Sequence, residues 1–182
     1  MSLARVLGSL ASLARTGWML RGVPPAIAET VAEHAFASAV IAGELCWRAR
    51  RRGLEVDVGR CIAMAVYHDM AESIIGDITR RADLGSEKRR VEERAYMELP
   101  LSPEAKELYL EFEGSASLEA RLARVAELLA TYWRATLYRS HGYEVDDIME
   151  SAKREALSIA RESGLLDEVQ EVVAEVTWVD QS

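Results

Sequence analysis

Four side chains that can bind a metal or transfer a proton lie close together near the middle of the chain. They are His68, Asp69, Glu72 and Asp77, which fall within ten consecutive residues. Apolar segments flank them, so some of these polar groups are expected to be drawn toward the interior. Burying a charge is costly unless the charge is paired or coordinates a metal. The most specific interpretation is a divalent metal held by His68 and Asp69, with the other two acids serving the chemistry.

A second histidine, His34, lies at the start of a predicted helix. Thr30-Val-Ala-Glu33 has the pattern of a capping box, with Thr30 as the N-cap, and the helix is expected to run to about residue 51. His34 therefore falls in the first turn and faces partly inward. A lone histidine in such a position is more often a hydrogen-bonded core residue than a ligand. It becomes a candidate ligand because a histidine–aspartate pair follows downstream.

One further carboxylate, Glu127, lies on the longest predicted helix, at about 117–140. Larger apolar side chains share one face of this helix, and Glu127 lies almost opposite that face. It is therefore either a solvated surface glutamate or part of a second buried face, lined by small residues such as Ala123 and Ala130. Small side chains on such a face would let a metal site approach the helix closely.

Arg15, Trp18 and Arg21 place an aromatic ring between two guanidinium groups, where Gly22 and two prolines indicate an irregular connection. Such residues can form a phosphate site with a ring against a sugar or a base. Arginine and tryptophan are also common surface anchors. On residue types alone, an anchored loop with solvated arginines is the favoured interpretation.

The apolar residues recur with helical spacing, and no segment alternates as a strand would. The expected helices span about residues 2–16, 30–51, 58–67, 70–75, 86–99, 102–113, 117–140, 145–162 and 165–176. A polar loop at about 79–85 is expected to lie over the site. The sequence thus predicts an all-α fold, a single-domain helical bundle over residues 1–182.

Composition excludes several other classes of protein. The chain is 49% hydrophobic with only 11 glycines and 4 prolines, which favours a compact helical protein. Its net charge of −8 argues against binding to a nucleic-acid polymer. No apolar run approaches the roughly 20 residues that cross a membrane. The N-terminal stretch lacks the pattern of a signal peptide. We therefore expect a cytoplasmic protein that does not bind membranes.

Cys46 and Cys61 lie in apolar surroundings without the spacing of a metal motif. Buried free thiols in a reducing compartment are the favoured interpretation, ahead of a disulfide or a metal site. Asparagine is absent and glutamine occurs only twice, which fits a thermophilic source, although a bias toward arginine also follows genome composition.

The order of the candidate ligands resembles that of the HD-domain metal phosphohydrolases. Their signature is a histidine, a histidine–aspartate pair and a later aspartate, all on one divalent metal. The string His68-Asp-Met-Ala-Glu72-x-x-x-Gly-Asp77-Ile looks like one branch, the small 5′-deoxynucleotidases. Other matching strings are Arg15-Thr-Gly-Trp18-x-x-Arg21, Glu87-Lys88, Glu92-Glu93-x-Ala95, Glu111-Phe-Glu113 and Ser117-x-Glu119-Ala120. The resemblance covers about 15–138, and the C-terminal helices at about 145–176 are less informative.

The resemblance implies an HD-type helical bundle with one divalent metal. Its ligands would be His34, His68, Asp69 and Glu127. Glu127 departs from the family pattern, since the aligned position is an aspartate, and the longer arm changes the reach of the carboxylate. Two imidazoles and two carboxylates suit several divalent ions. The resemblance favours Co²⁺ or Mn²⁺, with Fe²⁺, Ni²⁺, Zn²⁺ or Mg²⁺ as other candidates.

The resemblance also implies roles for the remaining polar residues. Glu72 would orient or deprotonate water, and Asp77 would act near the leaving sugar by proton transfer or by binding a hydroxyl. Arg15 and Arg21 would neutralise the phosphate. Trp18 could stack on the deoxyribose and help to exclude a 2′-hydroxyl. Little discrimination among bases is expected, because no stretch of the sequence indicates a pocket that reads the base.

The expected activity is hydrolysis of deoxynucleoside 5′-monophosphates by a homodimer. An HD phosphohydrolase acting on a deoxynucleoside triphosphate, a cyclic nucleotide or an alarmone is the first alternative. The second alternative is an oligomer that binds a metal or a nucleotide without hydrolysing it. The departure from the family pattern at Glu127 is the reason to consider it. The least specific alternative is a helical structural protein whose histidines belong to the core.

Overall fold

The computed structural model describes residues 1–79 and 86–178. The regular structure of these residues is helical, apart from one isolated bridge between Ala14 and Thr30. The helices are α1 (Leu3–Ser12), α2 (Thr16–Met19), α3 (Val31–Arg51), α4 (Val58–Tyr67), α5 (Glu72–Ile75), α6 (Ser86–Glu98), α7 (Pro103–Gly114), α8 (Leu118–Ser140), α9 (Asp146–Glu162) and α10 (Leu166–Val176). The predicted all-α fold is confirmed. None of the described helices is both long and apolar enough to cross a membrane. Most of the loop expected at 79–85 lies outside the described residues.

The helix starts follow the capping signals of the sequence. Thr30 and Glu33 exchange both hydrogen bonds of a capping box at the start of α3. Ser102 caps α7 ahead of Pro103, and Ser117 caps α8. These local signals therefore set the start, and with it the orientation, of the helices that carry the candidate site.

The short helix α2 lies in a stretch that the sequence predicts to be irregular. Asp77 lies far along the chain, yet its carboxylate accepts the backbone N–H of Thr16. Its backbone carbonyl also accepts the Thr16 hydroxyl, at 3.0 Å. Asp77 thus takes the place of a local N-cap, because it accepts a backbone N–H that has no partner within α2. The spacing of residues along the sequence cannot reveal such a contact.

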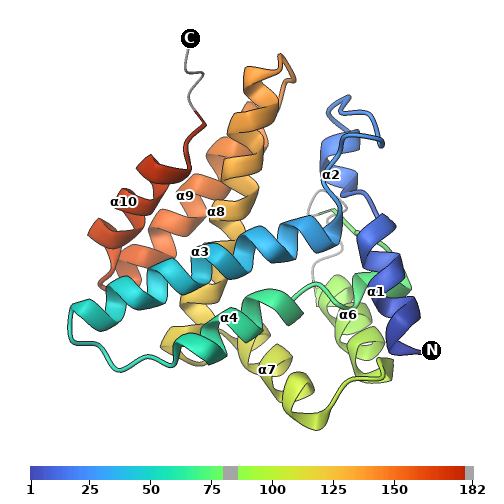
Figure 1. Ribbon diagram of the computed structural model, residues 1–182, viewed down its shortest axis with the longest axis horizontal. Helices are drawn as coiled ribbons and strands as arrows, with labels where there is room; N and C mark the ends of the chain where they lie inside the picture. Colours follow the sequence, from blue (N-terminus) through green and yellow to red (C-terminus); the bar gives the residue numbers. More distant parts are fainter. Residues whose placement is uncertain (80–85, 179–182) are drawn as a thin grey trace.

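Helix α8 occupies the centre of the molecule, where it packs against α3, α4, α7, α9 and α10. Figure 1 shows α8, α9 and α10 as neighbours at one side, α1, α5 and α6 at the other, and α3 running between these groups. Because partners cover α8 on both sides, Glu127 is only 5% exposed, and Ala123 and Ala130 are fully buried. Of the two interpretations left open for Glu127, the second buried face is correct.

Cys46 on α3 and Cys61 on α4 form a disulfide, so the expectation of free thiols is wrong. Gly43 lies at the same crossing of the two helices. A Cβ atom at Gly43 would lie only 3.3 Å from the Ile62 side chain. The missing side chain lets α3 and α4 approach closely, and this brings the two sulfur atoms together.

Reduction of this disulfide is expected to lower the free energy of unfolding by about 3 kcal/mol, because the bond joins residues with a sequence separation of 15. The measurement is unfolding by denaturant with and without a reductant, beside a thiol titration of the unfolded chain. The Cys46→Ala/Cys61→Ala double variant is the control, since its stability should not respond to the reductant. Two titratable thiols in the untreated, unfolded protein would contradict the disulfide.

Candidate active site

His34, His68 and Glu127 converge from α3, the end of α4 and α8. One ligand atom from each lies within 4.8 Å of the others, and all three residues are buried. Asp69 lies beside both histidines, with Oδ2 3.0 Å from His68 Nε2 and 3.9 Å from His34 Nε2. The structure thus brings together the two imidazoles and two carboxylates that the sequence indicates.

The backbone of α4 fixes the orientation of the His68 ring. The Nδ1 atom of His68 lies 2.8 Å from the carbonyl oxygen of Ala65, which can only accept a hydrogen bond, so Nδ1 carries the proton. In the neutral form of His68 the Nε2 lone pair consequently faces the site, which is the arrangement of a metal-binding histidine. His68 Nε2 is buried and has no hydrogen-bond partner among the residues that the structure describes, although the Asp69 carboxylate lies within ion-pair distance.

A second buried atom that has no partner within residues 1–79 and 86–178 is Oε2 of Glu72, the first residue of α5. Burial, together with the nearby carboxylates of Asp69 and Asp77, raises the pKa of Glu72 to about 10. A nearby cation would offset this accumulation of negative charge. The two unpartnered atoms, His68 Nε2 and Glu72 Oε2, and the mixed imidazole and carboxylate donors therefore fit a bound divalent cation.

The protonation of the two histidines differs because their neighbours differ. Burial, followed by the positive charges of Arg15 and His68, lowers the pKa of His34 well below its usual value. Burial also acts to lower the pKa of His68, but the Asp69 carboxylate outweighs it and the pKa rises. The pKa of Asp69 is held low, since the nearby His68, His34 and Arg15 outweigh the effect of burial. His34 is consequently neutral, the form in which imidazole binds a metal.

Arg15 lies beside His34, and its side chain is only 18% exposed. Its Nη1 lies 2.9 Å from His34 Nδ1, 3.3 Å from Thr131 Oγ1 and 3.4 Å from Glu29 Oε1. These contacts all use Nη1, which leaves Nε and Nη2 to bind an anion. The favoured interpretation of a solvated arginine is therefore wrong for Arg15.

Trp18 and Arg21 are also held by the protein. Trp18 is 2% exposed and donates its indole N–H to Glu29 at 2.7 Å. Arg21 pairs with Asp147 of α9, with 3.0 Å between Nε and Oδ1. The sequence analysis favours solvated side chains for Arg15 and Arg21, but both guanidinium groups are held by protein contacts.

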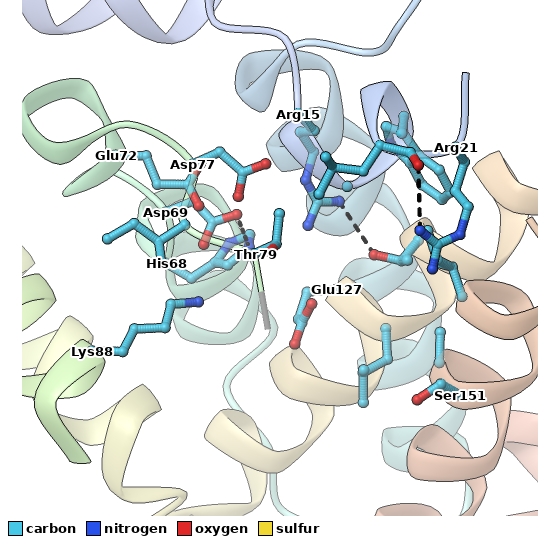
Figure 2. Close-up of a pocket in the computed structure, with 18 of the residues that line it drawn as sticks. Arg15, Arg21, His68, Asp69, Glu72, Asp77, Thr79, Lys88, Glu127 and Ser151 are labelled. Atoms are coloured by element: carbon cyan, nitrogen blue, oxygen red, sulfur yellow. Dashed lines mark hydrogen bonds and ion pairs between the residues drawn. The ribbon is translucent and has the colours of Figure 1, made fainter. Parts of the chain in front are cut away.

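These residues line one cavity of about 320 Å³, which lies within the range of small-molecule sites. Figure 2 shows His68, Asp69, Glu72 and Asp77 on one side of it, Arg15 and Glu127 near the middle, and Arg21 and Ser151 on the other side. The remaining lining residues include Leu20, Lys88, Glu92, Arg124, Leu128, Thr131, Asp147, Ile148 and Ala152. The structure thus gathers into one cavity every candidate from the sequence except His34, which lies behind it.

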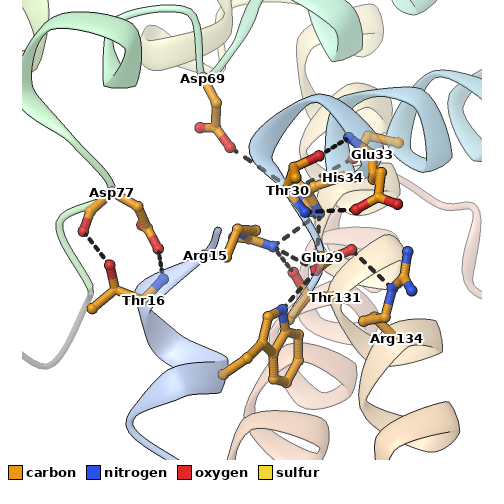
Figure 3. A network of polar contacts seen from close by, with 12 residues as sticks. Arg15, Thr16, Glu29, Thr30, Glu33, His34, Asp69, Asp77, Thr131 and Arg134 are labelled. Carbon is orange, nitrogen blue, oxygen red and sulfur yellow. Dashed lines mark hydrogen bonds and ion pairs between the residues drawn. The ribbon is translucent and has the colours of Figure 1, made fainter. Parts of the chain in front are cut away.

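Sequence reasoning missed two kinds of residue at the site. Lys88 and Arg124 add positive charge to the cavity, and only the matching string at Glu87-Lys88 gave a signal for either of them. Glu29 is a fully buried carboxylate between Arg15 and Trp18. The sequence around Glu29 does not indicate a role at the site, because the hydrogen-bond partners of its side chain come from other parts of the chain (Figure 3).

Comparison with known proteins places this architecture in a family. The profile of the family described as HD domain matches residues 7–164. The chain therefore belongs to the HD-domain family. Membership implies a divalent metal, and His34, His68 and Glu127 form a candidate site for it.

Similar proteins are found among both curated sequences and solved structures. The chain is 33% identical over 129 residues to the 5′-deoxynucleotidase hdd1 of Schizosaccharomyces pombe, which covers 65% of this chain and 61% of that protein. It is 31% identical over 141 residues to the human 5′-deoxynucleotidase HDDC2, covering 74% of this chain and 65% of that protein. The chain thus spans less than two thirds of the length of these curated relatives. The crystal structure of the PH0347 protein from Pyrococcus horikoshii OT3 has a TM-score of 0.81 at 30% identity, covering 97% of this chain and 98% of that one.

The Glu72→Gln variant is expected to be more stable than the unaltered protein when both are free of metal. The pKa of Glu72 is raised, so the folded protein is not destabilised by this carboxyl below about pH 4.5, the ordinary pKa, where the group is protonated in both states. The free energy of unfolding then falls as the pH rises toward about 10. Glutamine does not titrate, so the advantage should grow from pH 5 to pH 9. Each 1 kcal/mol corresponds to about 2–4 °C in thermal unfolding.

The measurement is thermal unfolding of chelator-treated protein across this pH range. Glu150→Gln is the matched control, because Glu150 is exposed on α9 and should give no pH-dependent difference. A Glu72→Gln protein that loses stability at alkaline pH relative to the unaltered chain would contradict the account of the buried carboxyl.

Proposed function

We propose that this protein is a metal-dependent 5′-deoxynucleotidase, which hydrolyses deoxynucleoside 5′-monophosphates to deoxynucleoside and phosphate. The observation that carries the proposal is the convergence of two histidines and two carboxylates beside the Arg15 guanidinium, at one cavity. Membership of the HD-domain family and the names of the similar curated proteins support it.

The proposed metal ligands are His34, His68, Asp69 and Glu127. The mixed imidazole and carboxylate set suits several divalent ions, and the resemblance to the HD phosphohydrolases favours Co²⁺ and Mn²⁺ among them. Fe²⁺, Ni²⁺, Zn²⁺ and Mg²⁺ are the other candidates. When bound, such an ion supplies positive charge to a phosphoryl oxygen and lowers the pKa of water.

The residues around the metal site are proposed to divide the remaining work. Arg15 binds the phosphate through Nε–H and Nη2–H. Arg21 is a weaker proposal for the phosphate, because it lies on the other side of the cavity and Asp147 offsets its charge (Figure 2). Glu72 orients the attacking water and accepts its proton on Oε2. The water oxygen bonds to phosphorus as the bond between phosphorus and the 5′-oxygen breaks. Asp77 assists the leaving sugar by proton transfer or by binding a hydroxyl.

Trp18 is proposed to act on the substrate indirectly. The Trp18 ring is only 2% exposed and donates a hydrogen bond to Glu29, so little of it can stack on the deoxyribose. We therefore propose that Trp18 shapes the cavity wall next to the sugar. The cavity lining combines apolar residues, among them Leu20, Ile148 and Ala152, with the polar groups of Arg21, Asp147 and Ser151. The expectation of little base discrimination therefore stays a prediction from the sequence.

Phosphate release is expected from dAMP and dTMP, weakly from AMP and not from dATP, when chelator-treated protein receives Co²⁺ or Mn²⁺. Mg²⁺ and Zn²⁺ are tested in parallel. Asp69→Ala, the control for the metal site, should lower the rate by about 100-fold or more, because an altered metal environment costs at least 10- to 100-fold. Release from dATP instead would point to another HD phosphohydrolase. No release with any ion would favour a protein that binds without turnover.

Replacement of Glu127 by alanine is expected to weaken Mn²⁺ binding by about 100-fold or more, because a proposed ligand is lost. Glu127→Asp should weaken it by about 10-fold, since α8 is packed on both sides and cannot follow the shorter arm. The measurement is competition with a fluorescent chelator, and Glu150→Gln is the exposed control. Unchanged affinity in Glu127→Ala would remove this residue from the ligand set.

We also propose that the protein is a homodimer joined through an apolar surface on α1 and α3. Leu3 and Leu7 on α1 and Phe36 and Val40 on α3 are each about half exposed or more, and Phe36 reaches 72%. Phe36 and Val40 line a groove that also includes Ala11 of α1 and Val176 of α10. Exposed apolar patches of this kind are typical of protein interfaces, and a second copy offers the same patch in return.

The Phe36→Glu/Val40→Glu variant is expected to be a monomer of about 20 kDa, whereas the unaltered protein has twice that mass. Light scattering after size-exclusion chromatography measures the mass of both. Val91→Glu replaces an exposed valine on α6 and should leave the dimer intact. An unaltered protein that is already monomeric at micromolar concentration would rule out this interface.

Residues 1–182 are proposed to form one HD domain, and the protein is proposed to act in the cytoplasm. The profile match over most of the chain supports the first point. The buried disulfide is compatible with a cytoplasmic location in hyperthermophiles, because intracellular disulfides are common in these organisms. The chain is similar to a protein from Pyrococcus horikoshii.

A further inference from the structure

Glu29 is a fully buried carboxylate with no part in the proposed reaction. It lies between α2 and α3, immediately before the N-cap of α3, and its side chain is 0% exposed. A buried carboxylate is costly to the fold unless it is paired. Its partners therefore indicate what the group stabilises.

Glu29 lies close to three residues with proposed roles at the site and to one further arginine, Arg134. Its Oε1 accepts the indole N–H of Trp18 at 2.7 Å and lies 3.4 Å from Arg15 Nη1. Its Oε2 accepts the Nε–H of Arg134 at 3.1 Å. Oε1 also lies 4.0 Å from His34 Nδ1, on the opposite side of the ring from the nitrogen that faces Asp69 (Figure 3).

The charges in this cluster leave an excess of one positive charge beside His34. Arg15 and Arg134 are both cations, and Glu29 is the carboxylate that pairs with each of them. Other carboxylates also act on the charge of Arg15, those of Asp69, Asp77 and Glu72. Loss of the Glu29 charge would nevertheless raise the positive charge beside a proposed metal ligand by one and would disfavour a divalent ion there. With the Glu29 charge in place, the remaining positive charge is available to attract a phosphate.

Glu29 also offers a hydrogen-bond acceptor that His34 needs. A histidine that binds a metal through one ring nitrogen carries its proton on the other and donates that proton to a carboxylate or carbonyl group. Arg15 is a donor only and cannot accept from His34 Nδ1. Glu29 Oε1, at 4.0 Å, is a carboxylate within a small movement of that nitrogen.

We propose that Glu29 is a positioning residue, which orients the metal-binding His34 and the phosphate-binding Arg15 through one shared carboxylate. This inference rests on the proposed function for the role of Arg15. With a metal on His34 Nε2, the ring proton would lie on Nδ1, and Glu29 Oε1 would accept a hydrogen bond from that N–H in place of the contact with Arg15 Nη1. Arg15 Nη1 would keep Glu29 and Thr131 as its partners, and the other N–H groups of the guanidinium would face the phosphate.

The backbone of Glu29 makes its substitution feasible. The backbone N–H of Arg15 donates to the Glu29 carbonyl at 2.9 Å, and the backbone N–H of Glu29 donates to the Tyr138 hydroxyl at 2.7 Å. Neither bond depends on the side chain, so the Glu29→Gln variant retains the path of this loop. Glutamine can still accept the Trp18 N–H, but it has no charge to offset Arg15 and Arg134.

The test compares Mn²⁺ affinity, measured by chelator competition without substrate, in Glu29→Gln, Arg134→Gln and the unaltered protein. Glu29→Gln is expected to bind Mn²⁺ about 10- to 100-fold more weakly. Arg134→Gln removes a cation from the same carboxylate and is expected to bind Mn²⁺ at least as tightly as the unaltered protein. Glu33→Gln, an exposed neighbour that can still cap α3, is the control and should match the unaltered protein.

These outcomes separate an electrostatic role from a merely structural one. If Glu29 only supported packing, both Glu29→Gln and Arg134→Gln would weaken Mn²⁺ binding, and this result would overturn the inference. Should Glu29→Gln fail to fold, weaker binding by Arg134→Gln would overturn it in the same way. Unchanged Mn²⁺ affinity in Glu29→Gln would also overturn it, even where the unaltered protein hydrolyses dAMP.

Binding of inorganic phosphate to Mn²⁺-saturated protein tests the second half of the proposal. Glu29→Gln is expected to bind phosphate about 10-fold more weakly, because Arg15 is no longer held in place. Loss of Mn²⁺ affinity with unchanged phosphate affinity would overturn the link to Arg15. If the unaltered protein releases no phosphate from any nucleotide, the proposed function fails, while the Mn²⁺ comparison still decides the role of Glu29.

Discussion

The cost of burying charge is the constraint on which the rest of this structure depends. Asp69, Glu72 and Glu127 lie together at the cavity, where Glu72 and Glu127 are buried, like charges repel and water screens them only in part. His68 and Arg15 offset part of this charge. What remains is a strongly acidic site with two unpartnered polar atoms, and a divalent cation would balance both the charge and the missing contacts.

The helices are arranged so that this acidic site can form. Small residues on α8, among them Ala123 and Ala130, let the helix lie close to its neighbours on two sides. Glu127 can therefore reach the histidines although it lies opposite the main apolar face. On the other side of the site, Asp77 and Glu29 attach the short α2 segment, and this places Arg15 at the cavity. The fold thus brings a proposed phosphate site and a proposed metal site together.

Local features of the sequence were sufficient to predict much of this arrangement. The helices follow from apolar spacing and from caps such as Thr30 and Ser117, and the resemblance to HD phosphohydrolases singled out the histidines and acids. Contacts between distant segments could not be predicted in this way. The cap that Asp77 provides for α2, the sulfur contact of Cys46 and the partners of Glu29 all depend on tertiary packing. The sequence could not decide whether the face of α8 that carries Glu127 is buried, because the residues that cover this face come from other helices.

A crystal of the protein grown with Mn²⁺ tests the central claim most directly, through the anomalous difference map at the manganese absorption edge. The account predicts one strong peak per chain, bonded to His34, His68, Asp69 and Glu127. A peak that lacks Glu127 would contradict the ligand set, since this carboxylate is the departure from the family pattern. A map without a peak between the two histidines would contradict the claim that the buried acidic site holds a metal.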